Sequence, residues 1–256
     1  MSNKNKKALM KNNQNLLLLA LFMGLYACMS GQKKQSHPIT YELPEQTKME
    51  LINEINQMAE LDEKYRSVIQ LGTLDTALLR RDKELSKKGD MSEYIAFTKT
   101  ITRTITQPQE DSLKLLQDKL DNQNYLKVKS IINEYGYPSK ERLGIKADKF
   151  APILLHFPNS LPPSQYLEEM TALLLPEVKE NRMEAISFAR FYDNLVTRFL
   201  GESQKYGTIR KFNVQTMTPG LPEIDNLEET NKLRSEIGME VLKEGEYHLS
   251  TIEQKN

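Results

Sequence analysis

Two residues in the apolar second half of the chain have side chains that can hold or exchange a proton. His156 lies in the run Ile153–Phe157, where its neighbours are apolar. Asp193 lies in a segment, Glu184–Leu200, whose apolar residues recur at helical spacing, and it falls in line with them. Its carboxylate must be paired, hydrogen-bonded or protonated, because an unsatisfied buried charge is costly.

Two arrangements are compatible with these residues. In the first, His156 and Asp193 share a polar pocket, with His156 as a general base and Asp193 orienting its ring. In the second, each is satisfied separately, by backbone groups or by an arginine such as Arg190 or Arg198. The first arrangement would suit a hydrolase-like enzyme, in which water serves as the nucleophile because no obvious nucleophilic residue accompanies the pair.

A third polar group follows in the segment Gln204-Lys205-Tyr206-Gly207-Thr208. Glycine permits a tight or left-handed turn, so the side chains of Gln204, Tyr206 and Thr208 around Gly207 can be directed into a cleft as binding residues. The alternative is a plain turn between a helix and a strand.

Cys28, the single cysteine of the chain, follows a leader typical of secreted bacterial proteins. Four lysines and no acidic residue precede the apolar stretch Leu16–Ala27, which is too short to span a bilayer. The sequence Leu25-Tyr26-Ala27-Cys28 resembles a lipobox. It predicts a signal peptide over 1–27, acyl chains such as palmitate on Cys28, and a flexible tether over 28–44. The alternative is a buried thiol in an ordinary apolar helix.

Composition excludes several classes of function. Lysine and arginine together number 35, as do aspartate and glutamate, and loss of the four leader lysines leaves a formal charge of −4. Charges of both signs are interleaved, so we expect no nucleic-acid partner. Three histidines and one cysteine make a metal cluster improbable, and we expect no metal. No phosphate loop, dinucleotide fingerprint or nucleophile elbow is present, so we expect no cofactor.

Helical periodicity predicts a mainly α, bundle-like domain over 45–250 with one small β turn or hairpin near residues 205–219. The residues 45–122 could form N-terminal helices that pack on a motif-bearing part, 123–250. In the first half we expect a helix over Glu45–Ile69, a second that is capped by Thr73 or Asp75 and ended by Gly89, a third that runs from Ser92 past Ile101, a fourth that starts at Pro108, and a fifth over Tyr125–Tyr135. In the second half we expect helices over Lys146–Phe157, Pro162–Leu175, Glu184–Leu200 and Asp225–Ile237. Pro176 is expected to kink or end the helix that precedes it.

Several short motifs, taken in order, resemble an uncharacterised bacterial family known as domain of unknown function 6624. The motifs are Tyr135-Gly136-Tyr137-Pro138 with Gly144, then His156, Asp193, Gln204-x-Tyr206-Gly207-Thr208 and Leu233-Arg234-x-x-Ile237-Gly238. Upstream, Leu61-Asp62-Glu63-Lys64-Tyr65-Arg66 is similar to the family's Asp-x-x-x-Arg element. The resemblance extends over roughly residues 46–247 and implies that Arg234 joins the candidate binding residues.

This chain departs from the family pattern at three places, and the family has no established activity. Ile209 stands where the family usually has glutamine, Phe157 where an acidic residue is frequent, and Asn194 where arginine is common. Such departures favour a binding role over catalysis. We therefore expect a lipoprotein of the bacterial cell envelope that binds an unknown ligand or envelope protein. Because Met29 and not aspartate follows Cys28, the expected location is the periplasmic face of the outer membrane.

Overall fold

The computed structural model describes residues 42–144, 149–213, 216 and 218–250. The predicted signal peptide, Cys28 and the greater part of the predicted tether lie outside these residues. Tyr41–Asn256 forms one compact unit, which is described here by itself. Within the described ranges, no helix combines the length and the apolar character needed to cross a bilayer.

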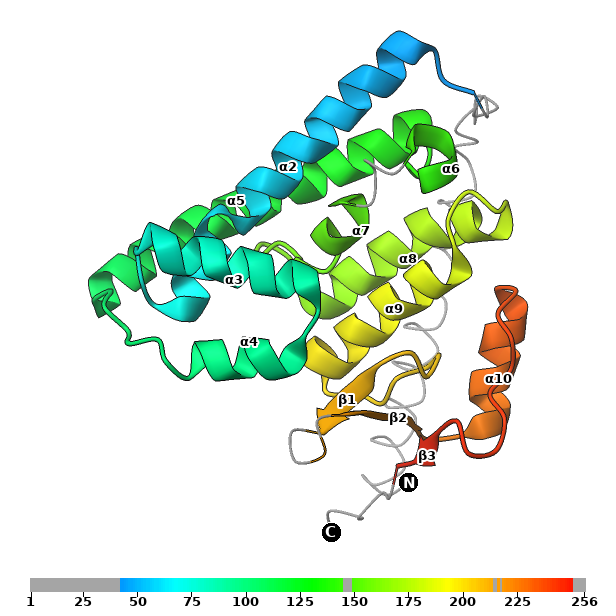
Figure 1. Ribbon diagram of the computed structural model, residues 1–256. Coiled ribbons are helices and arrows are strands. Elements are labelled where there is room, and N and C mark those ends of the chain that lie inside the picture. The colour runs from blue at the N-terminus through cyan, green and yellow to red at the C-terminus, as the bar shows by residue number, and fades with distance from the viewer. Residues whose placement is uncertain (1–41, 145–148, 214–215, 217, 251–256) are drawn as a thin grey trace, which may run out of the picture. The chain divides into compact units, whose positions relative to one another are not determined.

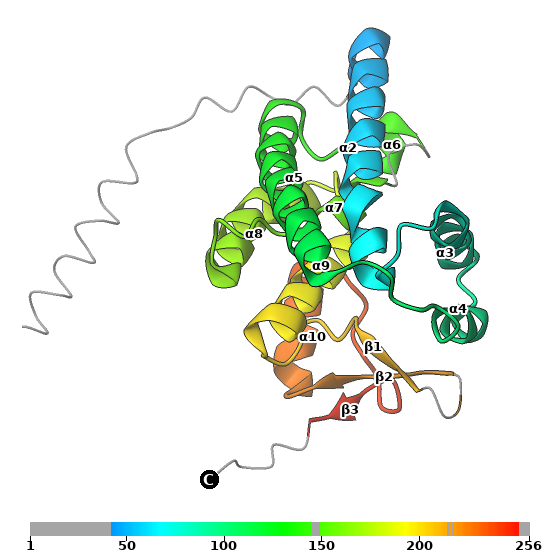
Figure 2. The ribbon, with the colours of Figure 1, turned by 90° about the vertical axis from the view of Figure 1, so that its left-hand side faces the viewer.

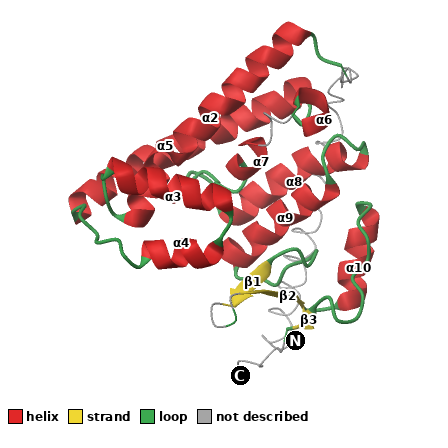
Figure 3. Ribbon diagram, in the orientation of Figure 1, coloured by secondary structure: helices red, strands yellow, loops and turns green. Residues whose placement is uncertain are grey.

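The prediction of a mainly α fold is confirmed (Figures 1 and 3). Most of the predicted helix starts and ends are also close to those observed, because local caps set them. Asp75 caps one helix and Gly89 ends it with φ of 71°. The helices and strands are α2 (Glu45–Leu71), α3 (Thr76–Lys88), α4 (Met91–Thr98), α5 (Gln107–Tyr135), α6 (Lys140–Leu143), α7 (Phe150–Ile153), α8 (Pro163–Lys179), α9 (Ala185–Leu195), a π-helical turn (Val196–Leu200), β1 (Arg210–Asn213), β2 (Thr218–Ile224), α10 (Leu227–Glu236) and β3 (His248–Leu249).

The two longest helices, α2 and α5, lie side by side and antiparallel, while α3 and α4 pack together beside α2 (Figure 2). Helix α5 begins at a capping box formed by Thr106 and Gln109 and ends at Gly136. The sequence predicted two helices here. No glycine or proline interrupts residues 109–135, so a single helix forms. It crosses the suggested division at residue 122, which is therefore wrong as a boundary.

Three other predicted bounds need correction. Helix α4 is capped by Asp90 and ends at Thr98. The stretch that follows is rich in threonine, which has a low helix propensity, and it is not helical. Of the predicted helix Lys146–Phe157, residues 145–148 lie outside the described part, and α7 covers only Phe150–Ile153. Pro176 neither ends nor begins a helix. It lies inside α8, one turn before the C-terminal end.

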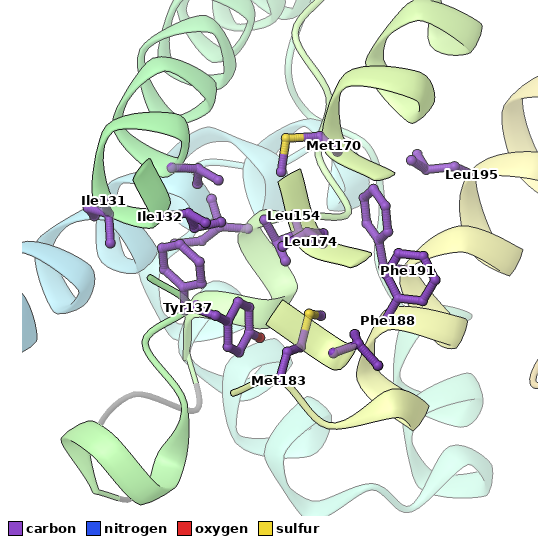
Figure 4. Packing of buried hydrophobic residues seen from close by; sticks show 14 of the residues in the cluster. Ile131, Ile132, Tyr137, Leu154, Met170, Leu174, Met183, Phe188, Phe191 and Leu195 are labelled. Carbon is purple, nitrogen blue, oxygen red and sulfur yellow. The ribbon is translucent and has the colours of Figure 1, made fainter. Parts of the chain in front are cut away.

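The main core forms where α2, α5, α7, α8 and α9 meet (Figure 4). Its side chains recur every three or four residues along each helix, as the amphipathic pattern requires. The largest fully buried side chains include Tyr166 on α8 and Phe188 and Phe191 on α9. The Tyr166 hydroxyl donates a 3.0 Å hydrogen bond to the carbonyl of Leu154, which fixes the turn that carries His156.

The predicted β element is present, although it extends beyond residue 219. Strands β1 and β2 pair antiparallel, with Asn213 opposite Thr218 and an irregularity between Arg210 and Phe212. Strand β3, near the C-terminus, adds to β2 in parallel and was not predicted, since a two-residue strand has no readable alternation.

Candidate functional site

His156 lies just after α7, in a turn whose backbone amides bond back to the preceding residues, including a bond from the His156 amide to the Ile153 carbonyl. Its Nδ1 is 2.7 Å from Oδ2 of Asp62 on α2. The Asp62 side chain is 3% exposed and that of His156 is 25% exposed. The carboxylate is therefore buried behind the ring, while part of the ring stays open.

Asp62 belongs to a network of polar side chains between α2 and α5. Its Oδ1 accepts hydrogen bonds from Asn124 at 3.2 Å and from Arg66 at 3.4 Å. The Arg66 guanidinium also pairs with Asp121 on α5. Asp121 in turn accepts a 2.9 Å hydrogen bond from Gln117. Gln117, Asp121 and Asn124 recur at helical spacing, so one stripe of α5 supplies all three.

The two carboxyl groups of this network have opposite pKa shifts. Burial alone raises the pKa of Asp62, but the hydrogen bond and charge of His156, together with Arg66, outweigh burial and hold the pKa below its ordinary value. Burial raises the pKa of Asp121, and Arg66 and Gln117 compensate only in part. Because Asp62 is ionised and can only accept, Nδ1 of His156 carries the proton, which leaves Nε2 as the free acceptor of a neutral ring.

A cavity of about 420 Å³ lies against this network. Its polar side includes Arg66, Gln117, Asp121 and His156, and its apolar side includes the ring pair Phe157 and Phe199. The remaining lining residues are Ile69, Gln70, Lys114, Asp118, Leu155 and Asn159. The cavity thus combines a buried charged wall with an aromatic one.

Two buried polar atoms beside the cavity have no hydrogen-bond partner within the described part of the chain. They are Nε of Arg66 and Oε1 of Gln117. Gln117 is 5% exposed, so its amide oxygen is removed from bulk solvent. A buried acceptor without a partner costs about 1–3 kcal/mol. Buried polar groups in folded proteins are nearly always hydrogen-bonded, so such an atom is expected to be completed by ordered water, an ion or a bound molecule.

The described residues also line two other cavities. The larger, about 650 Å³, lies along α8, and its charged lining residues Glu168, Lys179 and Glu180 are all exposed. A third, of about 250 Å³, is lined by residues of the 137–141 turn with Ala151, Glu184 and Ser187. Neither contains a histidine or a buried charged side chain. Size alone therefore does not identify the site, and the cavity at His156 has the richer chemistry.

Asp193 has a different environment from the one that a shared pocket with His156 would give it. It is fully buried on α9, and Oδ1 accepts the backbone amides of Lys205 at 2.8 Å and Tyr206 at 2.9 Å. Its Oδ2 accepts both the amide and the hydroxyl of Thr208, at 2.9 and 2.8 Å. Burial raises the pKa of Asp193, and these four hydrogen bonds act in the opposite direction.

The predicted His156–Asp193 pair is therefore not formed, and each residue has its own partners. The second arrangement considered from the sequence, with Asp193 satisfied by backbone groups, is the one observed. The physical reason is proximity along the chain. The turn after α9 returns its amides to a carboxylate only 12–15 residues earlier, whereas His156 contacts Asp62 on α2.

The predicted binding residues Gln204, Tyr206, Gly207, Thr208 and Arg234 instead hold this turn together. The Gln204 side chain exchanges two hydrogen bonds with the backbone of Ile209, at 2.7 and 3.0 Å. Arg234 donates to the Tyr206 carbonyl at 2.7 Å. The Tyr206 ring is buried. None of these residues lines any of the three cavities described above.

Gly207 is required by both conformation and space. Its φ is +64°, a left-handed value that side chains disfavour. A Cβ there would lie 2.9 Å from Cδ1 of Leu242 and 3.2 Å from Cγ2 of Ile224. The turn is therefore packed under the C-terminal segment, which agrees with a structural role.

Sequence analysis missed the contributions of Asp62, Asp121 and Gln117 to the cavity. A signal was available. Asp62 follows Ile55 and Met58 at helical spacing and so falls in an apolar stripe, by the same argument that singled out Asp193. Asp62 and Arg66 had been noted only through the family resemblance.

Within the described residues, no cluster of three or more histidine, cysteine, aspartate or glutamate side chains is arranged to hold a metal ion. Comparison with known proteins gives no relative: no family model, no curated protein and no solved structure matches the chain. The resemblance to domain of unknown function 6624 stays a prediction.

Proposed function

We propose that this domain is a binding module that takes a small molecule into the cavity at His156. The observation that carries the proposal is the buried amide oxygen of Gln117, which lies at the cavity without a hydrogen-bond partner in the described chain. Ligand sites hold a few oriented polar groups against an apolar wall, in pockets of about 300–1,000 Å³. A cavity of about 420 Å³ with both walls fits that description.

A fragment screen with a blocked-cavity variant tests the proposal. Gln70 is exposed and lines the cavity, so Gln70→Trp places an indole at the opening. Gln123 is exposed on α5 and does not line it, so Gln123→Trp is the matched control. We expect ligand-observed NMR to find fragments that bind the wild-type protein and Gln123→Trp but not Gln70→Trp. Fragments that bind all three proteins equally would contradict the assignment of the cavity.

We also propose that Cys28 carries the lipid anchor predicted from the lipobox, which would place the domain in the bacterial envelope as a member of the family that it resembles. The basic leader, the short apolar stretch and the single cysteine support this proposal. Labelled palmitate should enter the wild-type protein in cells and should be absent from Cys28→Ser. Equal labelling of both proteins, or an unprocessed leader in the wild type, would refute it.

A second function, hydrolysis, is favoured by one specific observation, the 2.7 Å contact of Asp62 with Nδ1 of His156. A carboxylate on one ring nitrogen orients the other nitrogen as a general base. In this version Asp62, and not Asp193, is the positioning residue. Water is the nucleophile, and His156 takes its proton.

An activated ester such as p-nitrophenyl acetate tests this second function. His156→Gln should remove the hydrolysis, and Asp62→Asn should move its pH profile. His248 is exposed near the C-terminus, so His248→Gln controls for the slow reaction of any surface imidazole. Equal losses from His156→Gln and His248→Gln would exclude a dedicated site.

A further inference from the structure

The charges around the cavity at His156 do not cancel. Arg66 is shared between Asp62 and Asp121, so this group of three has one negative charge in excess. Lys114 lines the cavity, and its ammonium pairs at 2.7 Å with Glu110, which also pairs with Arg103. Asp118 bonds to the neutral amide of Asn159, which contributes no charge. Among the described residues these are four carboxylates (Asp62, Asp118, Asp121 and Glu110) and three cations (Arg66, Lys114 and Arg103), so this side of the cavity carries one negative charge in excess before the imidazole of His156 is counted.

The unfilled hydrogen-bonding positions on its polar wall include several acceptors. Oε1 of Gln117 has no donor in the described chain. Asp121 receives both Arg66 and Gln117 on Oδ1, and its Oδ2 accepts no hydrogen bond from the described residues. Nε2 of His156 is a third acceptor when the ring is neutral. The unpartnered donor, Nε of Arg66, lies within the guanidinium that the two carboxylates already hold.

The opposite wall is aromatic. The rings of Phe157 and Phe199 meet edge to face, with centroids 4.5 Å apart. Phe199 is 42% exposed although it is a large apolar residue, and it is carried on the π-helical turn that ends α9. An aromatic face attracts an organic cation and also packs against its apolar part.

We infer that the ligand of this cavity is an organic amine, whose ammonium group donates to Asp121 and Gln117 and whose apolar body packs on Phe157 and Phe199. This inference rests on the proposed binding function and gives it a chemical class. Burial raises the pKa of Asp121, and Arg66 and Gln117 offset that rise only in part. An ammonium group at Oδ2 would supply the missing compensation. Among the described residues, the two cations that line the cavity, Arg66 and Lys114, are both held by carboxylates, so an anionic ligand would meet a wall with an excess of carboxylates.

Three probes of similar size separate charge from shape. They are phenethylamine, 2-phenylethanol and 3-phenylpropionate, titrated into the full chain near neutral pH with binding measured by NMR. We expect the amine to bind about tenfold or more tightly than the alcohol, the gain of a charge-assisted hydrogen bond. We expect no binding of the carboxylate. Equal affinities, tighter binding of the carboxylate, or no binding of the amine would overturn the inference.

Variants locate the amine. Asp121→Asn keeps the shape of the side chain and should reduce the affinity for the amine to that for the alcohol. Asp121 also pairs with Arg66, so its replacement affects the stability of the fold as well as binding. Phe199 is exposed, and its replacement therefore tests binding independently of the buried network. Phe199→Leu should weaken amine binding about two- to fivefold and alcohol binding less. Leu116→Ala, at an exposed position of α5 outside the cavity, should change neither.

The outcomes distinguish this inference from the proposal on which it rests. If the fragment screen gives ligands that Gln70→Trp excludes, but amines are not preferred among the three probes, the cavity is a binding site for another class and the inference fails alone. If Gln70→Trp excludes nothing, both fail. If Asp121→Asn and Phe199→Leu leave amine affinity unchanged, the amine binds elsewhere and the inference is overturned.

Discussion

Replacement of Asp62 tests whether the polar network holds α2, α5 and the His156 turn together. In Asp62→Ala, Arg66 and His156 lose their shared carboxylate and Asn124 loses its acceptor. Removing one partner of a buried ion pair costs about 3–5 kcal/mol. The side chains of Arg66 and His156 are 24% and 25% exposed, so water can hydrogen-bond to them in the variant and offset part of the lost free energy. We therefore expect the free energy of unfolding to fall by about 3 kcal/mol, the lower end of that range.

Asp62→Asn separates shape from charge in the same position. The amide oxygen can still accept from Asn124 and Arg66, but the amide nitrogen now faces Nδ1 of His156 and must donate to it. We expect a loss of about 1–2 kcal/mol, together with a change of the neutral ring from the Nδ1–H to the Nε2–H tautomer.

Urea unfolding and imidazole ¹⁵N NMR measure the two effects. Glu63→Ala is the control, because Glu63 is the exposed neighbour of Asp62 on α2, and we expect it to change stability by less than about 0.5 kcal/mol. If Asp62→Ala unfolds within that margin of the wild type, the network does not stabilise the fold. If the tautomer is unchanged in Asp62→Asn, the assignment of the His156 proton is wrong.

Three further predictions follow from the contacts described above. Because the pKa of Asp62 is lowered from 3.8 by folding, its contribution to stability is complete above about pH 5 and is lost as the pH falls through and below 3.8. Acid titration of unfolding should therefore show a smaller loss in Asp62→Asn than in the wild type. Gly207→Ala should destabilise by more than Gly201→Ala in urea unfolding, since both have φ near +65° but only Gly207 has Leu242 within reach of a Cβ. Equal losses would show that conformation alone matters. Asp193→Ala should lower the free energy of unfolding by about 3 kcal/mol or more, because it leaves three backbone amides without an acceptor, and a loss below about 1 kcal/mol would contradict its role.

Features that depend on neighbouring residues could be predicted from the sequence. Asp75, Gly89, Gly136 and Gly201 mark helix ends because a cap or a left-handed residue acts on the adjacent turn. The prediction of a separate helix from Tyr125 was wrong because helix length also depends on what the helix packs against, and α5 contacts α2 at both Asp121 and Asn124.

The candidate site was only half predictable for a related reason. His156 and Asp193 can be singled out from the sequence because each is polar among apolar residues. In the structure each is hydrogen-bonded within a polar cluster. The hydrogen-bond partners of these two residues depend on how the helices pack against each other. The periodicity of one helix predicts which of its faces is buried, but not which other segment of the chain covers that face. The contact of His156 with Asp62 spans 94 residues and that of Arg66 with Asp121 spans 55. The sequence therefore singled out the histidine that lies at the cavity but paired it with Asp193, whereas the structure pairs it with Asp62.

Those separations also give the two polar clusters different costs of loop closure. The turn at 205–208 closes onto Asp193 over 12–15 residues, a short loop that can form while the rest of the chain is still searching. The cavity at His156 is lined by four distant segments, and each long loop must be closed before its contacts stabilise the chain. Synthesis must pass residue 156 before the cavity has all its walls, and Phe199 comes later still. A chain emerging in order from its N-terminus therefore has all the walls of this cavity only after Phe199 has been synthesised.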